Sequence, residues 1–74
     1  MEVQYLDRYR VLGLNVAFYR KRLGYTQESL AEALGVSWVH IGKIECAAVG
    51  TSLDMLFRIA DTLQVEPSKL LEMR

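Results

Sequence analysis

The 74-residue chain has only one cysteine, Cys46, and only one histidine, His40. A single cysteine excludes an internal disulfide and any zinc site built from several cysteines. With one histidine as well, there are too few soft ligands for a metal centre. We therefore expect no metal and no cofactor. His40 has no accompanying acid or nucleophile in a catalytic pattern, so we expect no enzymatic activity.

The chain also lacks a surplus of positive charge, because nine Lys and Arg residues are balanced by nine Asp and Glu residues. It has no apolar run near the ~20 residues that a membrane span requires. Residues 1–8 contain acidic side chains and no unbroken apolar stretch, so they do not read as a secretory signal. We expect a cytoplasmic protein without membrane contact. Zero net charge lowers the expected non-specific affinity for DNA, although the charge on the binding face is what matters.

The composition is that of a soluble globular domain, with 51% hydrophobic and 24% charged residues. A chain of this length provides one compact domain, which we take to span residues 1–74. The apolar pattern contains no strand signal, no repeat and no linker. These features predict a single all-α domain.

Two longer segments show apolar residues at helical spacing. The first has Asp7 as a candidate N-cap and Gly24 at the position of a left-handed terminating residue. Its expected buried stripe consists of Leu12, Val16, Tyr19 and Leu23. The second follows Ser52, a candidate N-cap, and its expected apolar face consists of Leu53, Leu56, Phe57, Ala60 and Leu63.

Two short helices are expected between these segments. Thr26 caps one helix that ends at Gly35, and Ser37 caps the next, which runs from Trp38 to Glu45. Their expected buried residues are Leu30, Ala31, Leu34, Ile41 and Ile44. Residues 46–51 form a loop, because they are small and show no periodicity.

A fifth, short helix begins at Pro67, which suits the first position of a helix. Leu70 and Leu71 are expected to face inward. The result is a five-helix bundle with short connections.

Residues 26–45 form the most informative segment, with two short helices joined by a glycine-containing turn. Helices joined in this way cross steeply, so the second one protrudes. A helix about 10–12 Å wide fits a DNA major groove of about 12 Å. The segment therefore predicts a helix-turn-helix motif that binds double-stranded DNA.

The segment resembles the phage-repressor and Cro type of helix-turn-helix family, also called the XRE family. Residues 20–27 match the family's R-x-x-x-G-x-[ST]-Q pattern, and the sequence Leu34-Gly35-Val36-Ser37 matches its central turn. The match extends over residues 12–71 without gaps. It implies a lambda-repressor-like DNA-binding domain and a sequence-specific transcriptional regulator that acts as a homodimer.

The resemblance also implies roles for single residues. Gln27 would hydrogen-bond a phosphate, and Arg20 would pair with Glu45 to tie the first helix to the third. The recognition helix would present a further set of side chains to DNA, namely Ser37, Trp38, Val39, His40 and Lys43.

The chain departs from the family pattern at the recognition helix and in the loop that follows. Trp38 and Val39 stand where the family usually has polar or basic side chains, and residues 46–51 contain no basic residue. Trp38 and Val39 would contact either the DNA groove or a protein partner. Gly42 would allow close approach of either DNA or the second helix. A protein-interaction module with the same fold and weak or lost DNA binding is thus the alternative function.

The dimer surface has two candidates in the sequence. One is the aromatic segment near the N-terminus, and the other is the region from Leu70 to Met73.

Lys21 and Arg22 are either solvated or placed on phosphate.

Overall fold

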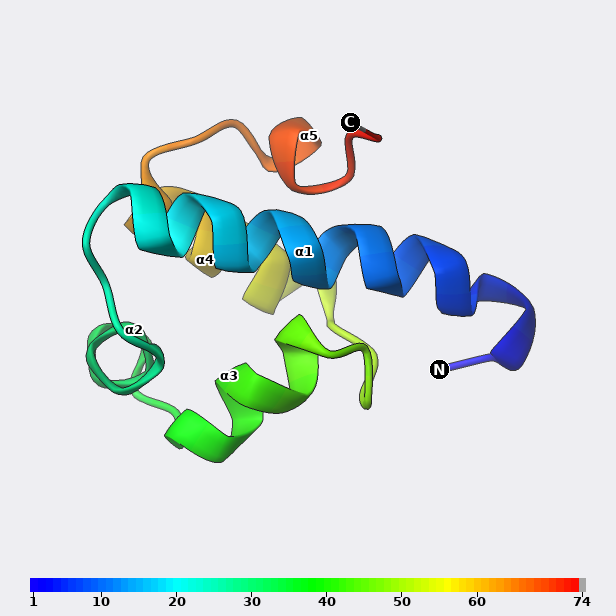
Figure 1. The fold of residues 1–74 in the computed structure, drawn as a ribbon, viewed down its shortest axis with the longest axis horizontal. Coiled ribbons are helices and arrows are strands. Elements are labelled where there is room, and N and C mark those ends of the chain that lie inside the picture. Colours follow the sequence, from blue (N-terminus) through cyan, green and yellow to red (C-terminus); the bar gives the residue numbers. More distant parts are fainter. Residues whose placement is uncertain (74) are drawn as a thin grey trace.

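The computed structural model describes residues 1–73, which form one 3-10 helix, five α-helices and no strand (Figure 1). In chain order the elements are η1 (Val3–Tyr5), α1 (Leu6–Arg22), α2 (Gln27–Leu34), α3 (Trp38–Glu45), α4 (Leu53–Leu63) and α5 (Pro67–Leu70). Figure 1 shows α1 in the middle of the molecule, with α5 on one side and α2 and α3 on the other. The expected all-helical bundle is confirmed. None of the helices among residues 1–73 has the length and apolar character needed to cross a bilayer.

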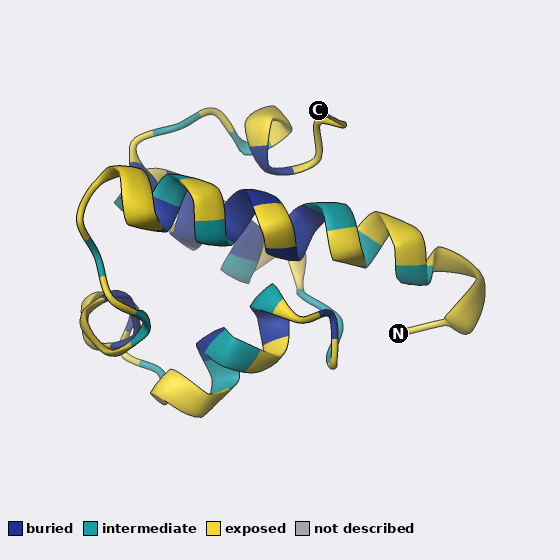
Figure 2. Ribbon diagram, viewed as in Figure 1, coloured by how far each residue is buried: buried dark blue, intermediate teal, exposed yellow. Residues whose placement is uncertain are grey.

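A single apolar core joins all five α-helices. Its largest fully buried side chains are Val16, Leu30, Ile41, Ile44, Ile59, Leu63 and Leu70. Burying a Val, Leu or Ile side chain contributes about 1.5–3 kcal/mol each. The buried residues lie along the inner faces of the helices, while the first turn of α3 stays exposed (Figure 2). The core thus fixes α3 through one face only.

The helix boundaries follow from local chemistry. The hydroxyl oxygens of Thr26, Ser37 and Ser52 each accept a hydrogen bond from the backbone N–H three residues later, at 2.9, 3.2 and 3.1 Å. Gly24 and Gly35 adopt left-handed conformations with φ of 81° and 71°. L-residues with a Cβ rarely adopt such angles, which makes glycine the suitable residue at both turns. These three caps and both terminating glycines were predictable from the sequence, and they are confirmed.

The expectations for the two ends of α1 were wrong in part. The helix begins at Leu6, so Tyr5 is the N-cap residue and Asp7 lies in the first turn. There its negative charge still suits the positive end of the helix dipole. Leu23 is exposed, because the helix ends at Arg22 and the chain turns away before the apolar stripe can continue.

The apolar faces of α4 and α5 are narrower than expected. Leu53 and Phe57 are exposed, and Ile59 is fully buried. Leu53 lies in the first turn of α4, beyond the edge of the core. Phe57 lies beside the buried face. Leu71 is also exposed, because it follows the last residue of α5 and is turned away from the core.

A buried asparagine fastens the C-terminal segment to α1. Asn15 Nδ2 donates to the backbone oxygens of Leu70 and Glu72, at 3.0 and 2.8 Å. The two hydrogens of one amide nitrogen thereby satisfy two carbonyls at the end of α5. This contact was not predicted, since nothing near Asn15 in the sequence indicates a partner at residue 70.

Candidate nucleic-acid interface

The turn between α2 and α3 sets the direction of α3. Residues 35–37 connect the helices, and Val36 N–H donates to the carbonyl of Ala31 at 3.0 Å, which closes the end of α2. In Figure 1, α2 is seen nearly end-on while α3 lies across the view, so the two helices cross steeply. This is the geometry of a helix-turn-helix motif.

The α3 helix has one buried face and one exposed face. Ile41 and Ile44 are buried, whereas Trp38 is 56% exposed and Val39 is 47% exposed. Lys43 and Ser37 are also exposed, and His40 is half-buried. Five of the six residues that the sequence assigns to DNA therefore lie on α3 or at its cap, with His40 the least exposed of them, and the sixth, Gln27, begins α2.

The buried ion pair between α1 and α3 is present in the structure. Arg20 Nε donates to one carboxylate oxygen of Glu45 at 2.6 Å, and Arg20 Nη2 donates to the other at 3.1 Å. The two side chains are only 9% and 8% exposed. Arg20 Nη1 also donates to the carbonyl of Tyr25 at 3.0 Å, which adds the entry to α2 to the same cluster. Arg20 is therefore committed to the fold and is not available to DNA.

Gln27 belongs to the same cluster. Its Nε2 atom donates to Glu45 Oε1 at 3.0 Å, and its side chain is half-buried at the start of α2. An amide nitrogen carries two hydrogens, so the bond to Glu45 leaves the second for another acceptor. The Gln27 side chain is thus held in a defined orientation before any ligand is bound.

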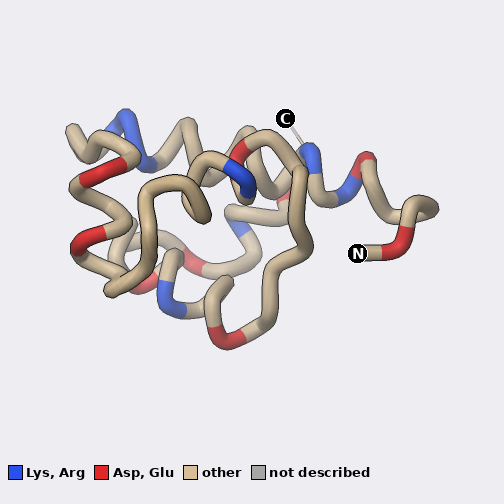
Figure 3. Tube along the Cα trace, turned by 90° about the horizontal axis from the view of Figure 1, so that it is seen from below, with Lys and Arg blue, Asp and Glu red and all other residues tan. Residues whose placement is uncertain are grey.

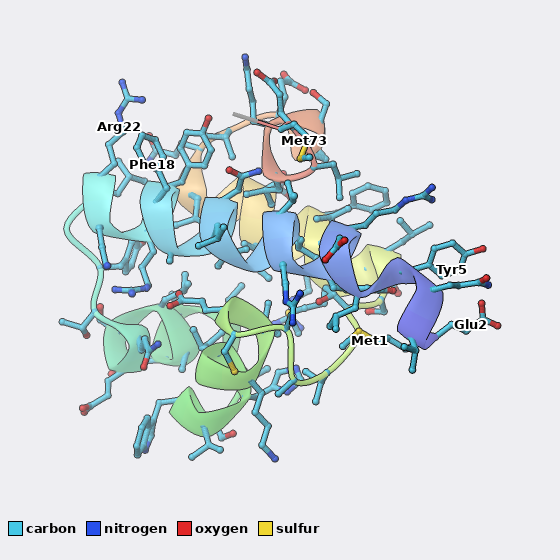
Figure 4. All side chains as sticks on the ribbon, turned by 45° about the vertical axis from the view of Figure 1, so that its right-hand side comes forward. Met1, Glu2, Tyr5, Phe18, Arg22 and Met73 are labelled. Atoms are coloured by element: carbon cyan, nitrogen blue, oxygen red, sulfur yellow. The ribbon has the colours of Figure 1, made fainter. Side chains whose placement is uncertain are left out.

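Free positive charge is scarce around α2 and α3. Lys43 is the only Lys or Arg between residues 26 and 51, and α2 carries Glu28 and Glu32 on its exposed face. Figure 3 shows basic and acidic residues interspersed along the chain. Arg22 extends from the side of α1 away from α2 and α3 (Figure 4), so it is not placed to join a phosphate contact with them.

Several other cations already have partners. Arg58 donates to the carbonyl of Leu34 at the end of α2, Arg10 pairs with Asp7, and Lys69 pairs with Glu72. The carbonyl groups at a helix C-terminus carry partial negative charge, so Arg58 stabilises α2 there.

The loop after α3 offers backbone and small side chains only. Ala47 is buried with a positive φ of 60°, and Cys46 is exposed with its Sγ 3.7 Å from the carbonyl oxygen of Lys43. Within residues 1–73 no group of three or more His, Cys, Asp or Glu side chains is arranged to hold a metal ion.

A glycine of α1 determines how closely α1 and α3 pack. A Cβ atom built on Gly13 would lie 2.3 Å from the backbone oxygen of Glu45 and 2.7 Å from that of Ile44. Any larger residue would push α3 away from α1. In the sequence Gly13 only weakens a helical pattern, so its role in positioning α3 was not predicted.

Comparison with known proteins supports the same motif. The helix-turn-helix family model matches residues 16–70. The chain is 35% identical over 60 residues to the uncharacterized HTH-type transcriptional regulator YazB of Bacillus subtilis strain 168. This match covers 81% of this chain and 87% of YazB.

Two solved structures have a closely similar fold. The restriction-modification controller protein C.AhdI from Aeromonas hydrophila superposes with a TM-score of 0.81 at 26% identity, over 86% of this chain and 97% of C.AhdI. The master regulator for biofilm formation SinR, solved in complex with DNA, superposes with a TM-score of 0.77 at 31% identity. That match covers 82% of this chain and 98% of SinR.

Proposed function

The chain belongs to the helix-turn-helix family of the XRE and Cro type, and we propose that it is a transcriptional regulator that places α3 in the DNA major groove. The main observation in favour of this function is that α3 has an exposed face between Ser37 and Lys43. The face is exposed because α3 crosses α2 steeply. The Arg20–Glu45 ion pair supports it by fixing α3 to α1. The SinR structure in complex with DNA supports the same assignment by similarity.

Each of the six candidate residues then has a part in the complex. Gln27 and Lys43 contact the phosphate backbone and set the position of the domain. Trp38, Val39 and His40, in the first turn of α3, face the base edges, as N-terminal residues of recognition helices do. Ser37 caps the helix, whose first amides attract a phosphate.

The regulator binds DNA as a homodimer in this proposal. One short helix contacts half a site, and paired half-sites lie about 34 Å apart. The two candidate dimer segments meet in one groove of about 290 Å³, which Tyr5 and Tyr9 of the N-terminal part line together with Leu71 and Leu53. Leu53 is 67% exposed, so this apolar surface is available to a second copy.

We place the protein in the cytoplasm, with double-stranded DNA as its partner, and without a cofactor or catalytic activity. The domain is taken as residues 1–74, with the helix-turn-helix motif at residues 26–45. In this proposal, regulation depends on occupancy of the DNA site and on dimerisation.

Selection of bound duplexes from random DNA tests the proposal. The wild-type protein should prefer its best selected duplex over a scrambled one by at least tenfold, measured by fluorescence anisotropy. Sedimentation of the complex should give two protomers per site, and Leu53→Lys should reduce this to one. A domain that binds all duplexes equally would not be a sequence-specific regulator.

The exposure of Trp38 beside Val39 favours a second function, a protein-interaction module. In that case Trp38→Ala would abolish capture of a protein partner and leave weak DNA binding unchanged. Failure of the selection experiment together with that result would establish the alternative.

A further inference from the structure

We propose that Trp38 and Val39 read the 5-methyl groups of thymines, so that the DNA sites of this protein are defined by thymine positions. This rests on the proposed function, because it assumes that α3 occupies the major groove. It specifies the kind of DNA that α3 recognises and the contact by which it does so.

The exposed tip of α3 lacks the side chains that read guanine or adenine by paired hydrogen bonds. Such reading uses Arg or Lys for guanine and Asn or Gln for adenine. The base-facing residues Trp38, Val39 and His40, and the cap Ser37, include none of these types, and Lys43 lies in the last turn of the helix. The base-facing end of α3 therefore presents mainly apolar surface.

The major-groove edges of the four bases carry only one methyl group, the 5-methyl group of thymine. Covering it removes apolar surface from water on both partners, which is favourable. An exposed indole or isopropyl group gains nothing comparable from the polar edge of guanine or cytosine. The apolar side chains of Trp38 and Val39 are therefore suited to contact the methyl group of thymine.

Gly42 indicates that a surface approaches α3 closely. A Cβ at Gly42 would meet only the side-chain amide of Gln27, at 3.8 and 3.9 Å, which is ordinary van der Waals contact. Packing within the protein therefore does not require glycine here. Glycine destabilises a helix interior relative to alanine, so glycine at this half-buried position beside Gln27 fits close approach by DNA.

Substitution of single thymines by deoxyuridine tests the proposal, since deoxyuridine lacks only the 5-methyl group. In the best selected duplex, wild-type affinity should fall about fourfold at each contacted thymine, which corresponds to about 0.8 kcal/mol for one buried methyl group. Trp38→Ala or Val39→Ala should bind the thymine duplex more weakly and no longer distinguish it from the uridine duplex at one of these positions. Both side chains are exposed, so both variants should keep the wild-type thermal midpoint.

The converse substitution adds a methyl group. Cytosine at a sensitive position should weaken binding, and 5-methylcytosine at the same position should restore part of the affinity. Uridine outside the protected site is the control and should have no effect.

Two results would overturn the proposal while leaving the function intact. One is a selected site at which no uridine changes affinity by twofold, and the other is a uridine effect that persists in both variants. Failure to select any site would overturn the proposed function as well.

Discussion

Glu45 accepts hydrogen bonds from two different helices, because its Oε1 atom is 3.0 Å from Gln27 Nε2 and 3.1 Å from Arg20 Nη2. The last residue of α3 thereby connects the start of α2 to the end of α1. One carboxylate supports both the fold and the side chain proposed to contact phosphate. Substitutions in this cluster should therefore show which side chains determine the free energy of unfolding and which determine the affinity for DNA.

Glu45→Ala should lower the free energy of unfolding by about 3–5 kcal/mol, because it leaves the Arg20 guanidinium buried without its counter-ion. Urea denaturation measures the change. Asp7→Ala is the matched control, since it removes an ion pair at the surface, and it should cost less than about 1 kcal/mol. Equal effects of the two variants would show that the Arg20–Glu45 pair is not a structural element.

Gln27→Ala should change stability little, since Arg20 still pairs with Glu45, but it should weaken binding to every duplex by a similar factor. Gln27→Glu should weaken binding further, because it places a second carboxylate beside Glu45 and a negative charge near phosphate. Titration of both variants against the selected and scrambled duplexes measures these effects. A change in the preference between the two duplexes would instead assign Gln27 to base reading.

Two glycines within helices should respond oppositely to alanine. Gly13→Ala should destabilise the fold by about 1–3 kcal/mol, because its Cβ overlaps the backbone of Glu45 and the helices must separate. Gly42→Ala has room for its methyl group and should stabilise α3 by up to about 1 kcal/mol. The same Gly42 variant should bind DNA more weakly than wild type. Thermal unfolding and anisotropy together check the pair, and a Gly42 variant with unchanged affinity would contradict close approach.

Local signals in the sequence were sufficient for the motif. Thr26 and Ser37 begin their helices through hydrogen bonds within three residues, and Gly35 ends α2 by its own backbone angle. Such interactions depend on neighbours in the chain, so the bounds of α2 and α3 were predictable. The family pattern added the Arg20–Glu45 contact across the chain.

Long-range packing was not predictable in the same way. Asn15 bonds to residues 70 and 72, and Gly13 touches Glu45, so neither role exists until the helices are assembled. For Leu53 and Leu71 the sequence predicted burial, but both are exposed because they lie where the core ends. If the proposed dimer forms, these two leucines lie in its interface.

Lys43 allows a test of how the domain contacts the DNA backbone. It is exposed on α3, and among the described residues from 26 to 51 it is the only Lys or Arg side chain. Each phosphate that a cation neutralises releases about one counter-ion, so Lys43→Ala should reduce the slope of log affinity against log salt by about one unit. The loss of affinity should be similar for the selected and scrambled duplexes, because phosphate contacts carry no sequence information.

Lys69→Ala is the control for this measurement, since Lys69 lies on α5, on the other side of α1 from α3 (Figure 1). It should leave the salt slope unchanged, although it removes the same charge from the protein. If both variants lowered the slope equally, the effect would come from net charge and not from a contact at α3. If Lys43→Ala changed the ranking of duplexes, Lys43 would read a base, and guanine would be its partner by hydrogen-bond chemistry. Because α3 offers so little other positive charge, the wild-type slope should itself be small, and a steep slope would require basic contacts from outside residues 26–51.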